Sequence, residues 1–190
     1  MLSARPFIAR SLLVNRKSFL VEIVATGCFL AASMLMPSTA SAQADPRVAK
    51  SMASLKAMVA NLGAPRLEGK EPVGGKDAPI LYFGSTKINN TFEIVDVISK
   101  EDGKGMTATF FVKSGDEYIR VSTNVLKPDG SGRAIGTILD PNGKVIAKIK
   151  EGQPFYGEVM ILGSPYIAGY EQIKRAGGDV IGIYYVGYKK

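Results

Sequence analysis

The polar side chains best suited to bind a ligand stand in the segment 118–125. An extended strand points successive side chains to opposite faces. One face of this segment then carries Tyr118, Arg120 and Ser122, and the intervening residues are mostly apolar. An arginine guanidinium flanked by hydroxyl groups can bind a small anion or a polar solute. The alternation therefore predicts a binding face on this strand, with Arg120 as its strongest candidate.

Two tyrosines of a later segment form a second candidate group. Tyr166 and Tyr170 are four residues apart with Ala168 between them, so in an extended segment both point to the same side. The pair is equally consistent with a solvated sheet face, because tyrosine is common in strands. A second arginine, Arg133, lies in a glycine-rich stretch, where arginine is more often merely exposed. The residues alone leave open whether these side chains meet Arg120 in a pocket.

The composition excludes most of the common catalytic mechanisms. The chain has no histidine, and Cys28 is its only cysteine. These absences exclude Ser/His/Asp and Cys/His nucleophiles, histidine metal sites, zinc clusters and an intramolecular disulfide. Glu93 and Asp96 fall on opposite faces of their predicted strand, and the acidic turns lack the ligand alternation of a calcium loop. We expect no enzyme, no catalytic residue, no metal and no cofactor; an enzyme based on carboxylates, lysine or tyrosine is the least favoured alternative.

The elements that position these residues begin with an amphipathic helix. Asp45 is the predicted N-cap before Pro46, and apolar residues then recur at spacings of three and four: Val48, Met52, Leu55, Val59 and Leu62. Gly63 and Pro65 close the helix. The stretch 66–79 is rich in glycine, proline and charge, which is typical of a loop.

Short β-type segments fill the rest of the chain. Strands are predicted at 92–97, 107–112, 118–125, 157–162, 166–173 and 180–188. Asp-Gly and Gly-Asp turns between them favour antiparallel hairpins. A break at 140–143 precedes a short helix around 145–149. The predicted fold class is α+β: an N-terminal helix packed on an antiparallel sheet of about five or six strands, with a mid-chain insertion that carries small helices.

The first 42 residues have the three-part pattern of a secretory signal peptide. A basic stretch precedes an apolar run over 19–35, and Ala40 and Ala42 are the small residues that signal peptidase requires at −3 and −1. We expect cleavage after Ala42 and a periplasmic or secreted protein. The alternatives are an uncleaved inner-membrane anchor over 19–35, a run that Glu22 interrupts, and an organellar transit peptide.

The positive charge of the chain belongs in part to this N-terminal segment. The formal net charge is +7, and residues 1–42 hold four basic side chains against Glu22 alone. The remainder carries only +4, from 20 basic and 16 acidic residues. We therefore expect no nucleic-acid partner.

Eight segments together resemble a known family of sensors. The residues that carry the resemblance are 81–84, 89–96, 107–112, 118–125, 136–137, 155–158, 161–171 (ILGSPYIAGYE) and 180–188 (VIGIYYVGY). In order and spacing they are similar to the single Cache domains of extracytoplasmic sensors. The variant they resemble most is the fused form found in methyl-accepting chemotaxis receptors and sensor kinases.

The resemblance implies a PAS-like central sheet and a small-molecule pocket between that sheet and the mid-chain insertion. Family ligands include small carboxylates, amino acids and other metabolites. Transferred by position, the resemblance assigns ligand binding to Arg120, Ser122, Tyr156, Tyr166 and Tyr170. The expected domains are a signal peptide at 1–42, the N-terminal helix at 43–65 and a single Cache core at 66–190.

The expected function is that of an exported sensor that binds a small carboxylate or amino acid. A Cache receptor normally continues into a second transmembrane helix and a signalling module, whereas this sequence ends two residues after Tyr188. We therefore expect a membrane receptor, sensor kinase or transporter as partner. N-terminal helices of the family commonly pair, which implies a homodimer through this helix. The alternative is a ligand-free interaction or accessory module of a membrane receptor or transporter.

Overall fold

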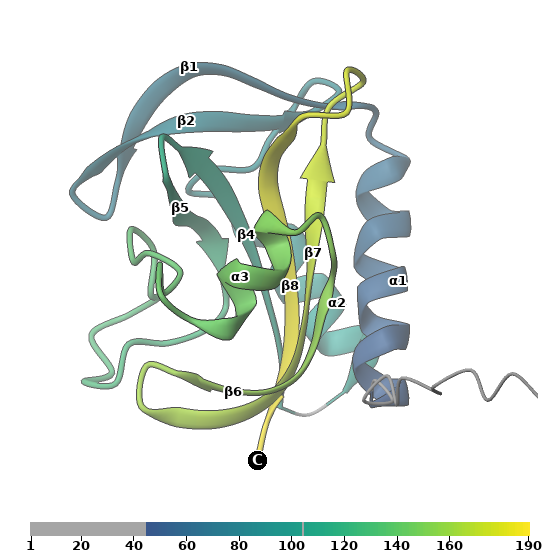
Figure 1. The fold of residues 1–190 in the computed structure, drawn as a ribbon, viewed down its shortest axis with the longest axis vertical. Coiled ribbons are helices and arrows are strands. Elements are labelled where there is room, and N and C mark those ends of the chain that lie inside the picture. The colour runs from purple at the N-terminus through teal and green to yellow at the C-terminus, as the bar shows by residue number, and fades with distance from the viewer. Residues whose placement is uncertain (1–44, 104) are drawn as a thin grey trace, which may run out of the picture. The chain divides into compact units, whose positions relative to one another are not determined.

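A five-stranded antiparallel sheet forms the centre of the fold (Figure 1). The computed structural model describes residues 45–103 and 105–190. The strand order is β5-β4-β8-β7-β6, with β4 (Met106–Ser114), β5 (Glu117–Thr123), β6 (Phe155–Ile161), β7 (Ser164–Lys174) and β8 (Val180–Lys189). These strands correspond to the segments predicted from residue 107 onward, and the predicted α+β class is confirmed.

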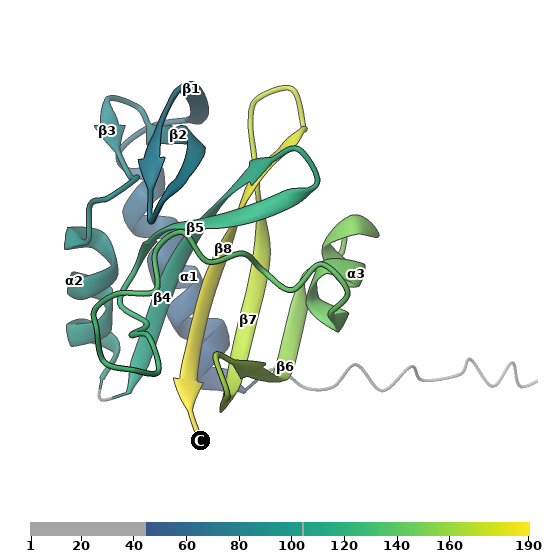
Figure 2. The ribbon, with the colours of Figure 1, turned by 90° about the vertical axis from the view of Figure 1, so that its left-hand side faces the viewer.

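The mid-chain insertion connects the two edges of this sheet. β5 and β6 are the edge strands, so the chain between them, 124–154, crosses from one edge to the other. It carries the predicted short helix, α3 (Lys144–Lys150), whose residues Val145, Ile146 and Ile149 are buried. In Figure 2, α3 lies on one side of the sheet, and α1 and α2 lie on the other.

The predicted amphipathic helix is α1 (Pro46–Ala60). Asp45 accepts a hydrogen bond from the Arg47 amide at 2.9 Å, which satisfies one of the free N–H groups at the helix start. Four of the predicted apolar positions are buried in the core: Val48, Met52, Leu55 and Val59. The fifth, Leu62, lies beyond the helix and is 37% exposed, because the chain turns where Gly63 packs against Gly84.

The loop predicted at 66–79 is wrong, since this stretch forms a hairpin. β1 (Pro65–Val73) pairs with β2 (Lys76–Phe83), and the short β3 (Thr86–Lys87) completes a separate three-stranded sheet. Gly74 and Gly75, both with positive φ, form the two-residue turn, which is the geometry that joins antiparallel strands best. β1 is mostly exposed and has no apolar run, so its sequence resembles that of a loop.

The strand predicted at 92–97 is also wrong, because the segment is the start of helix α2 (Glu93–Asp102). Val95 and Ile98, three residues apart, are its buried positions, and that spacing is helical. Glu93 and Asp96 lie in the first turn and Lys100 in the last, an arrangement that the helix dipole favours. The segment contains β-branched residues, which favour strands, but its apolar positions are buried at helical spacing.

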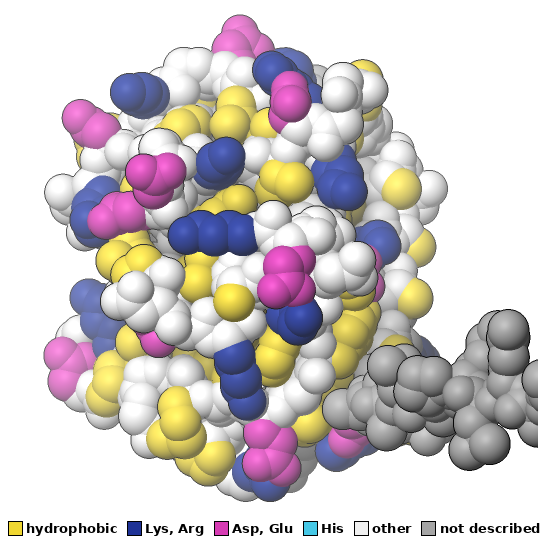
Figure 3. Space-filling view, viewed as in Figure 1, with side chains coloured by type: hydrophobic (Ala, Val, Ile, Leu, Met, Phe, Trp, Pro, Cys, Tyr) yellow, Lys and Arg dark blue, Asp and Glu magenta, His cyan; other side chains and the backbone are white. Residues whose placement is uncertain are grey.

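The face of the molecule that carries α3 and β6 is chemically mixed. Figure 3 shows positive and negative side chains interspersed on this face, with hydrophobic side chains exposed between them. None of the helices in the described ranges is both long enough and apolar enough to cross a lipid bilayer. The predicted signal peptide, its cleavage point after Ala42 and the apolar run 19–35 lie outside the described residues.

Candidate functional site

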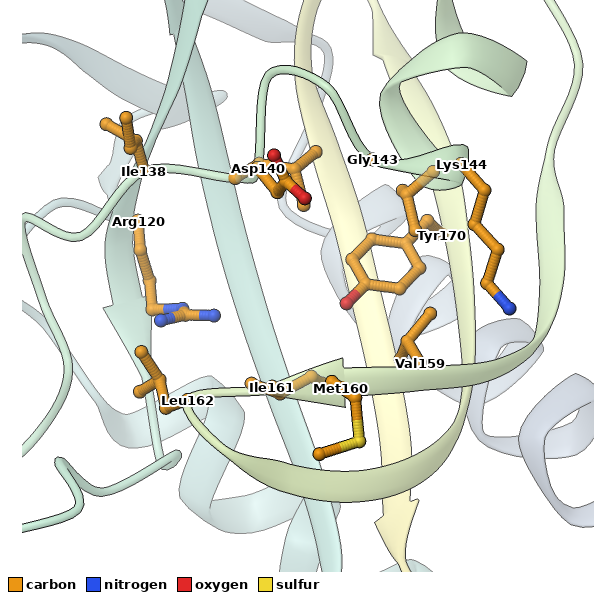
Figure 4. Close-up of a pocket in the computed structure, with 12 residues that line it drawn as sticks. Arg120, Ile138, Asp140, Gly143, Lys144, Val159, Met160, Ile161, Leu162 and Tyr170 are labelled. Atoms are coloured by element: carbon orange, nitrogen blue, oxygen red, sulfur yellow. The ribbon is translucent and has the colours of Figure 1, made fainter.

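A cavity of about 400 Å³ opens between the central sheet, the start of α3 and strand β6 (Figure 4). Its lining comes from β5, the insertion, β6 and β7: Arg120, Ile138, Leu139, Asp140, Gly143, Lys144, Val145, Val159, Met160, Ile161, Leu162 and Tyr170. We call it the Arg120 cavity. The guanidinium of Arg120 and the hydroxyl of Tyr170 enter it from opposite sides and are directed toward the space between them.

Arg120 is the only charged residue among the buried residues of the described chain, with an exposed fraction of 5%. Its Nη1 donates to Thr137 Oγ1 at 2.5 Å, and its Nε has no hydrogen-bond partner. The guanidinium also lies 5.0 Å from the centre of the Phe111 ring. No ion pair among the described residues includes Arg120. A buried cation without a carboxylate partner is costly, so this arrangement requires an explanation.

The insertion holds Arg120 from the outer edge of β5. The Arg120 amide donates to Thr137 O at 2.9 Å, and the Gly136 amide donates to Arg120 O at 2.8 Å. Thr137 Oγ1 in turn donates to Ala134 O at 2.8 Å, which leaves its lone pairs toward the guanidinium. The insertion therefore covers an otherwise free strand edge and fixes the arginine in one conformation.

Tyr170 is 2% exposed and packs in an aromatic cluster on the same face of the sheet. Its ring centre lies 4.9 Å from that of Tyr185 and 6.1 Å from that of Phe155. Burial raises the pKa of the Tyr170 hydroxyl, although the charge of Arg120 opposes this effect. Burial likewise lowers the pKa of Arg120, and the nearby tyrosines partly oppose it. The tyrosines are therefore neutral hydrogen-bonding groups and supply no counter-charge.

Tyr166 shares the face of Tyr170, as the spacing predicts, but it lines a neighbouring cavity. This second cavity, of about 640 Å³, we call the Tyr166 cavity. Ile161 and Leu162 line both cavities, so the turn between β6 and β7 separates them. Burial raises the pKa of Tyr166, and the charge of Arg120 opposes the rise. Arg120 therefore acts electrostatically on tyrosines of both cavities.

Ser122 does not share the face of Arg120, and the prediction that it does is wrong. Phe110 pairs with Ser122, whereas the next residue, Phe111, pairs with Arg120. Val121 is thus the extra residue of a β-bulge, which reverses the alternation from that point. Ser122 Oγ donates to Thr91 O at 2.5 Å on the side of α2, away from the Arg120 cavity.

Tyr156 lies on the α1 side of the sheet and does not line the Arg120 cavity. Its hydroxyl donates to Glu171 Oε1, and Lys56 Nζ lies 2.6 Å from Glu171 Oε2. Burial, together with the hydrogen bond to Glu171, raises the pKa of the Tyr156 hydroxyl. These contacts connect β6 and β7 to α1.

Arg133, the second arginine candidate, is engaged in a structural ion pair. Its Nη1 and Nη2 donate to the two carboxylate oxygens of Asp96 at 2.9 and 2.8 Å. It also donates to Thr123 O at 2.8 Å. This fork ties the insertion to α2 and leaves Arg133 outside the lining of the Arg120 cavity.

Several lining residues were missed by sequence reasoning. Val159 and Ile161 alternate within the predicted strand 157–162, so that alternation could have identified them. Leu162 has a positive φ of 47°, which is rare for leucine, beside a glycine that could have marked the turn. Nothing in the local sequence marks Thr137 as the partner of Arg120.

The comparisons with known proteins agree with this geometry. The family model of the Cache 3/Cache 2 fusion domain matches residues 33–190, which include all the residues that the structure describes. Neither the comparison with curated proteins nor that with solved structures gave a match. Cache domains are extracytoplasmic sensor modules that bind small molecules, and they are sensory rather than catalytic. The chain belongs to the Cache 3/Cache 2 fusion domain family.

Proposed function

We propose that this Cache domain binds a small organic carboxylate in the Arg120 cavity and presents the bound state to a membrane receptor, sensor kinase or transporter. The observation that carries the proposal is the buried guanidinium of Arg120, which lines a cavity and has no carboxylate partner among the described residues. A ligand carboxylate would supply the missing negative charge in a place where water screens it little.

The strand β8 offers a path from the ligand to the first turns of α1. On the cavity side, Tyr185 of β8 lies 4.9 Å from Tyr170, measured between ring centres. On the other side, Tyr188 of the same strand shares a 2.9 Å hydrogen bond with Ser51 of α1. Arg47 of α1 lies 4.8 Å above the Tyr188 ring. A shift of β8 on ligand binding would therefore move the residues of α1 that contact Tyr188. This coupling supports a role in presenting the bound state.

The proposal is tested by ligand binding to the purified protein, freed of bound small molecules by unfolding and refolding. The probes are a panel of carboxylates, each paired with its neutral amide. We expect carboxylates alone to raise the melting temperature, since a ligand at 100 times its dissociation constant adds about 2.7 kcal/mol of stability. Arg120→Met is expected to weaken carboxylate binding at least tenfold, whereas the exposed Arg47→Met is the matched control and should not.

Two results would contradict the proposal. One is equal binding of carboxylates and amides, or binding that survives Arg120→Met unchanged. The other is the recovery of a membrane partner whose affinity is unaffected by Arg120→Ala and Tyr170→Ala and by added carboxylates. The second result would select the ligand-free interaction module instead.

A further inference from the structure

We infer that the ligand of the Arg120 cavity is a monocarboxylate with an apolar body, rather than a dicarboxylate, a very small acid or an amino acid. This inference rests on the proposed function and names the class of ligand for the same cavity. It follows from the number of charges that face the cavity and from the chemistry of the remaining lining.

Among the described residues, only one cation is directed into the Arg120 cavity. The lining contains two basic residues, Arg120 and Lys144. Lys144 is exposed, and its ammonium lies over the Phe155 ring at 5.4 Å from the ring centre, turned away from the cavity in Figure 4. A ligand with one carboxylate therefore matches the charge of the cavity. A second carboxylate would lose its hydration without gaining a cation.

The acidic residue of the lining is held in a turn by a backbone hydrogen bond. Asp140 Oδ1 accepts a hydrogen bond from the Asn142 amide at 3.0 Å, which holds the carboxylate in the turn before α3. A dicarboxylate in the cavity would also be repelled by this group. An amino acid would need a partner for its ammonium, and Asp140, the only carboxylate among the described lining residues, is exposed, so an ion pair with it would contribute little.

The rest of the lining is apolar, and part of it is exposed to water. Val145, Val159 and Ile161 form the inner wall beside α3 and β6. At the mouth, Leu162 and Ile138 are each 37% exposed, whereas the side chain of Met160, which is 68% exposed, leads away from the space between Arg120 and Tyr170 in Figure 4. Leu162 and Ile138 are among the few large hydrophobic side chains that the described chain leaves exposed, and both line this cavity. A bound apolar group would remove this surface from water, which favours binding.

The size of the cavity agrees with such a ligand. A volume of about 400 Å³ lies in the range of pockets that hold molecules much larger than a two-carbon acid. The turn at Leu162 and Gly163, where both residues have positive φ, holds the Leu162 side chain at the boundary between the Arg120 and Tyr166 cavities. Leu162 is therefore placed to contact the apolar body of a ligand whose carboxylate meets Arg120.

The inference is tested by isothermal titration of the refolded, ligand-free protein with five probes at one pH and ionic strength. The probes are 3-phenylpropionate, its neutral amide, acetate, succinate and phenylalanine. We expect 3-phenylpropionate to bind at least tenfold more tightly than each of the other four. Leu162→Ala is expected to reduce its affinity several-fold and to leave that of acetate unchanged. Leu62→Ala, a leucine with the same exposed fraction of 37% outside both cavities, is the matched control.

The outcomes separate this inference from the proposed function. If acetate or succinate binds as tightly as 3-phenylpropionate and Arg120→Met abolishes this binding, the ligand class is wrong and the proposed function stands. Tighter binding of phenylalanine, lost in Asp140→Asn, would overturn the ligand class in favour of an amino acid. If the amide binds as well as its acid, or if no carboxylate of this set or of the wider panel binds, both the ligand class and the proposed carboxylate recognition are wrong.

Discussion

Arg120 is a buried positive charge whose neighbours in the protein are uncharged. They are the Thr137 hydroxyl, the Phe111 ring and neutral tyrosines. Thr137 accepts a hydrogen bond from Nη1, the guanidinium carbon lies 5.0 Å from the centre of the Phe111 ring, and Nε has no hydrogen-bond partner. Desolvation lowers the pKa of this guanidinium, but arginine stays protonated in proteins. The buried charge therefore remains, and it lowers the free energy of unfolding. Binding sites contain residues that reduce stability until a ligand binds. Here a ligand carboxylate would complete the ion pair of the guanidinium.

We predict that Arg120→Met raises the stability of the ligand-free protein. Methionine fills a similar volume without a charge, and Thr137 keeps its hydrogen bond to Ala134 O. The free energy of unfolding should increase by about 1 kcal/mol or more. Urea denaturation of the refolded protein measures it, and Arg47→Met, whose side chain is 64% exposed, should change stability by no more than about 0.5 kcal/mol. A loss of stability in Arg120→Met would mean that the guanidinium is a structural group.

At the scale of elements, the insertion positions the site because backbone hydrogen bonds attach it to the edge of β5 at Arg120 and Tyr118. The Gly136 amide donates to Arg120 O at 2.8 Å, and the Leu139 amide donates to Tyr118 O at 2.9 Å. The same segment packs against the β1–β2 turn, where a Cβ at Gly136 would lie 2.7 Å from the Gly74 Cα. The small sheet is therefore part of what holds Thr137 beside Arg120.

We predict that Gly136→Ala destabilises the protein by about 2–3 kcal/mol and weakens carboxylate binding. The residue has a φ of 78°, and its backbone neighbours cannot move as a flexible side chain would. Gly130→Ala is the matched control, because Gly130 has a φ of 70° but nothing within 4 Å of an added Cβ. Its cost should be about 1 kcal/mol, from backbone strain alone. Equal effects of the two variants in urea denaturation would show that the contact with the β1–β2 turn contributes nothing.

At the scale of the whole molecule, the two faces of the central sheet have separate tasks. The face toward α3 contains the Arg120 cavity and the cluster of Phe155, Tyr170 and Tyr185. The opposite face packs α1 and α2 and contains the larger apolar core. β8 contributes side chains to both faces, so it is the element through which a ligand on one face could affect a helix on the other.

We propose that residues 1–42 are removed on export, and we predict a mature protein that begins at Gln43. The basic stretch, the apolar run and the small residues before Gln43 are the basis of this prediction. Intact-mass measurement of the protein recovered from the cell-envelope fraction tests it. A full-length chain that stays in the membrane after an alkaline wash would instead support an anchor over 19–35.

Local patterns in the sequence were sufficient for most elements, and they named Arg120 and Tyr170 as candidates. The spacing of three and four identified α1, and the alternation and turn residues identified β4 to β8. Arg120 and Tyr170 were named as candidates, but the sequence left open whether they face a pocket or solvent. These features depend on periods of 3.6 and 2.0 residues, which neighbouring positions in the chain reveal by themselves.

Tertiary structure decided which side chains share the cavity. The bulge at Val121 turns Ser122 to the opposite face, and its position depends on the register between β4 and β5. Tyr156 bonds to Glu171 on the α1 side, and Thr137 reaches Arg120 from 17 residues away along the chain. The helix α2 and the β1–β2 hairpin bury their apolar residues in the core that α1 and the central sheet share. Such outcomes depend on contacts between segments that no local period encodes, which is why the cavity could be recognised only in the folded protein.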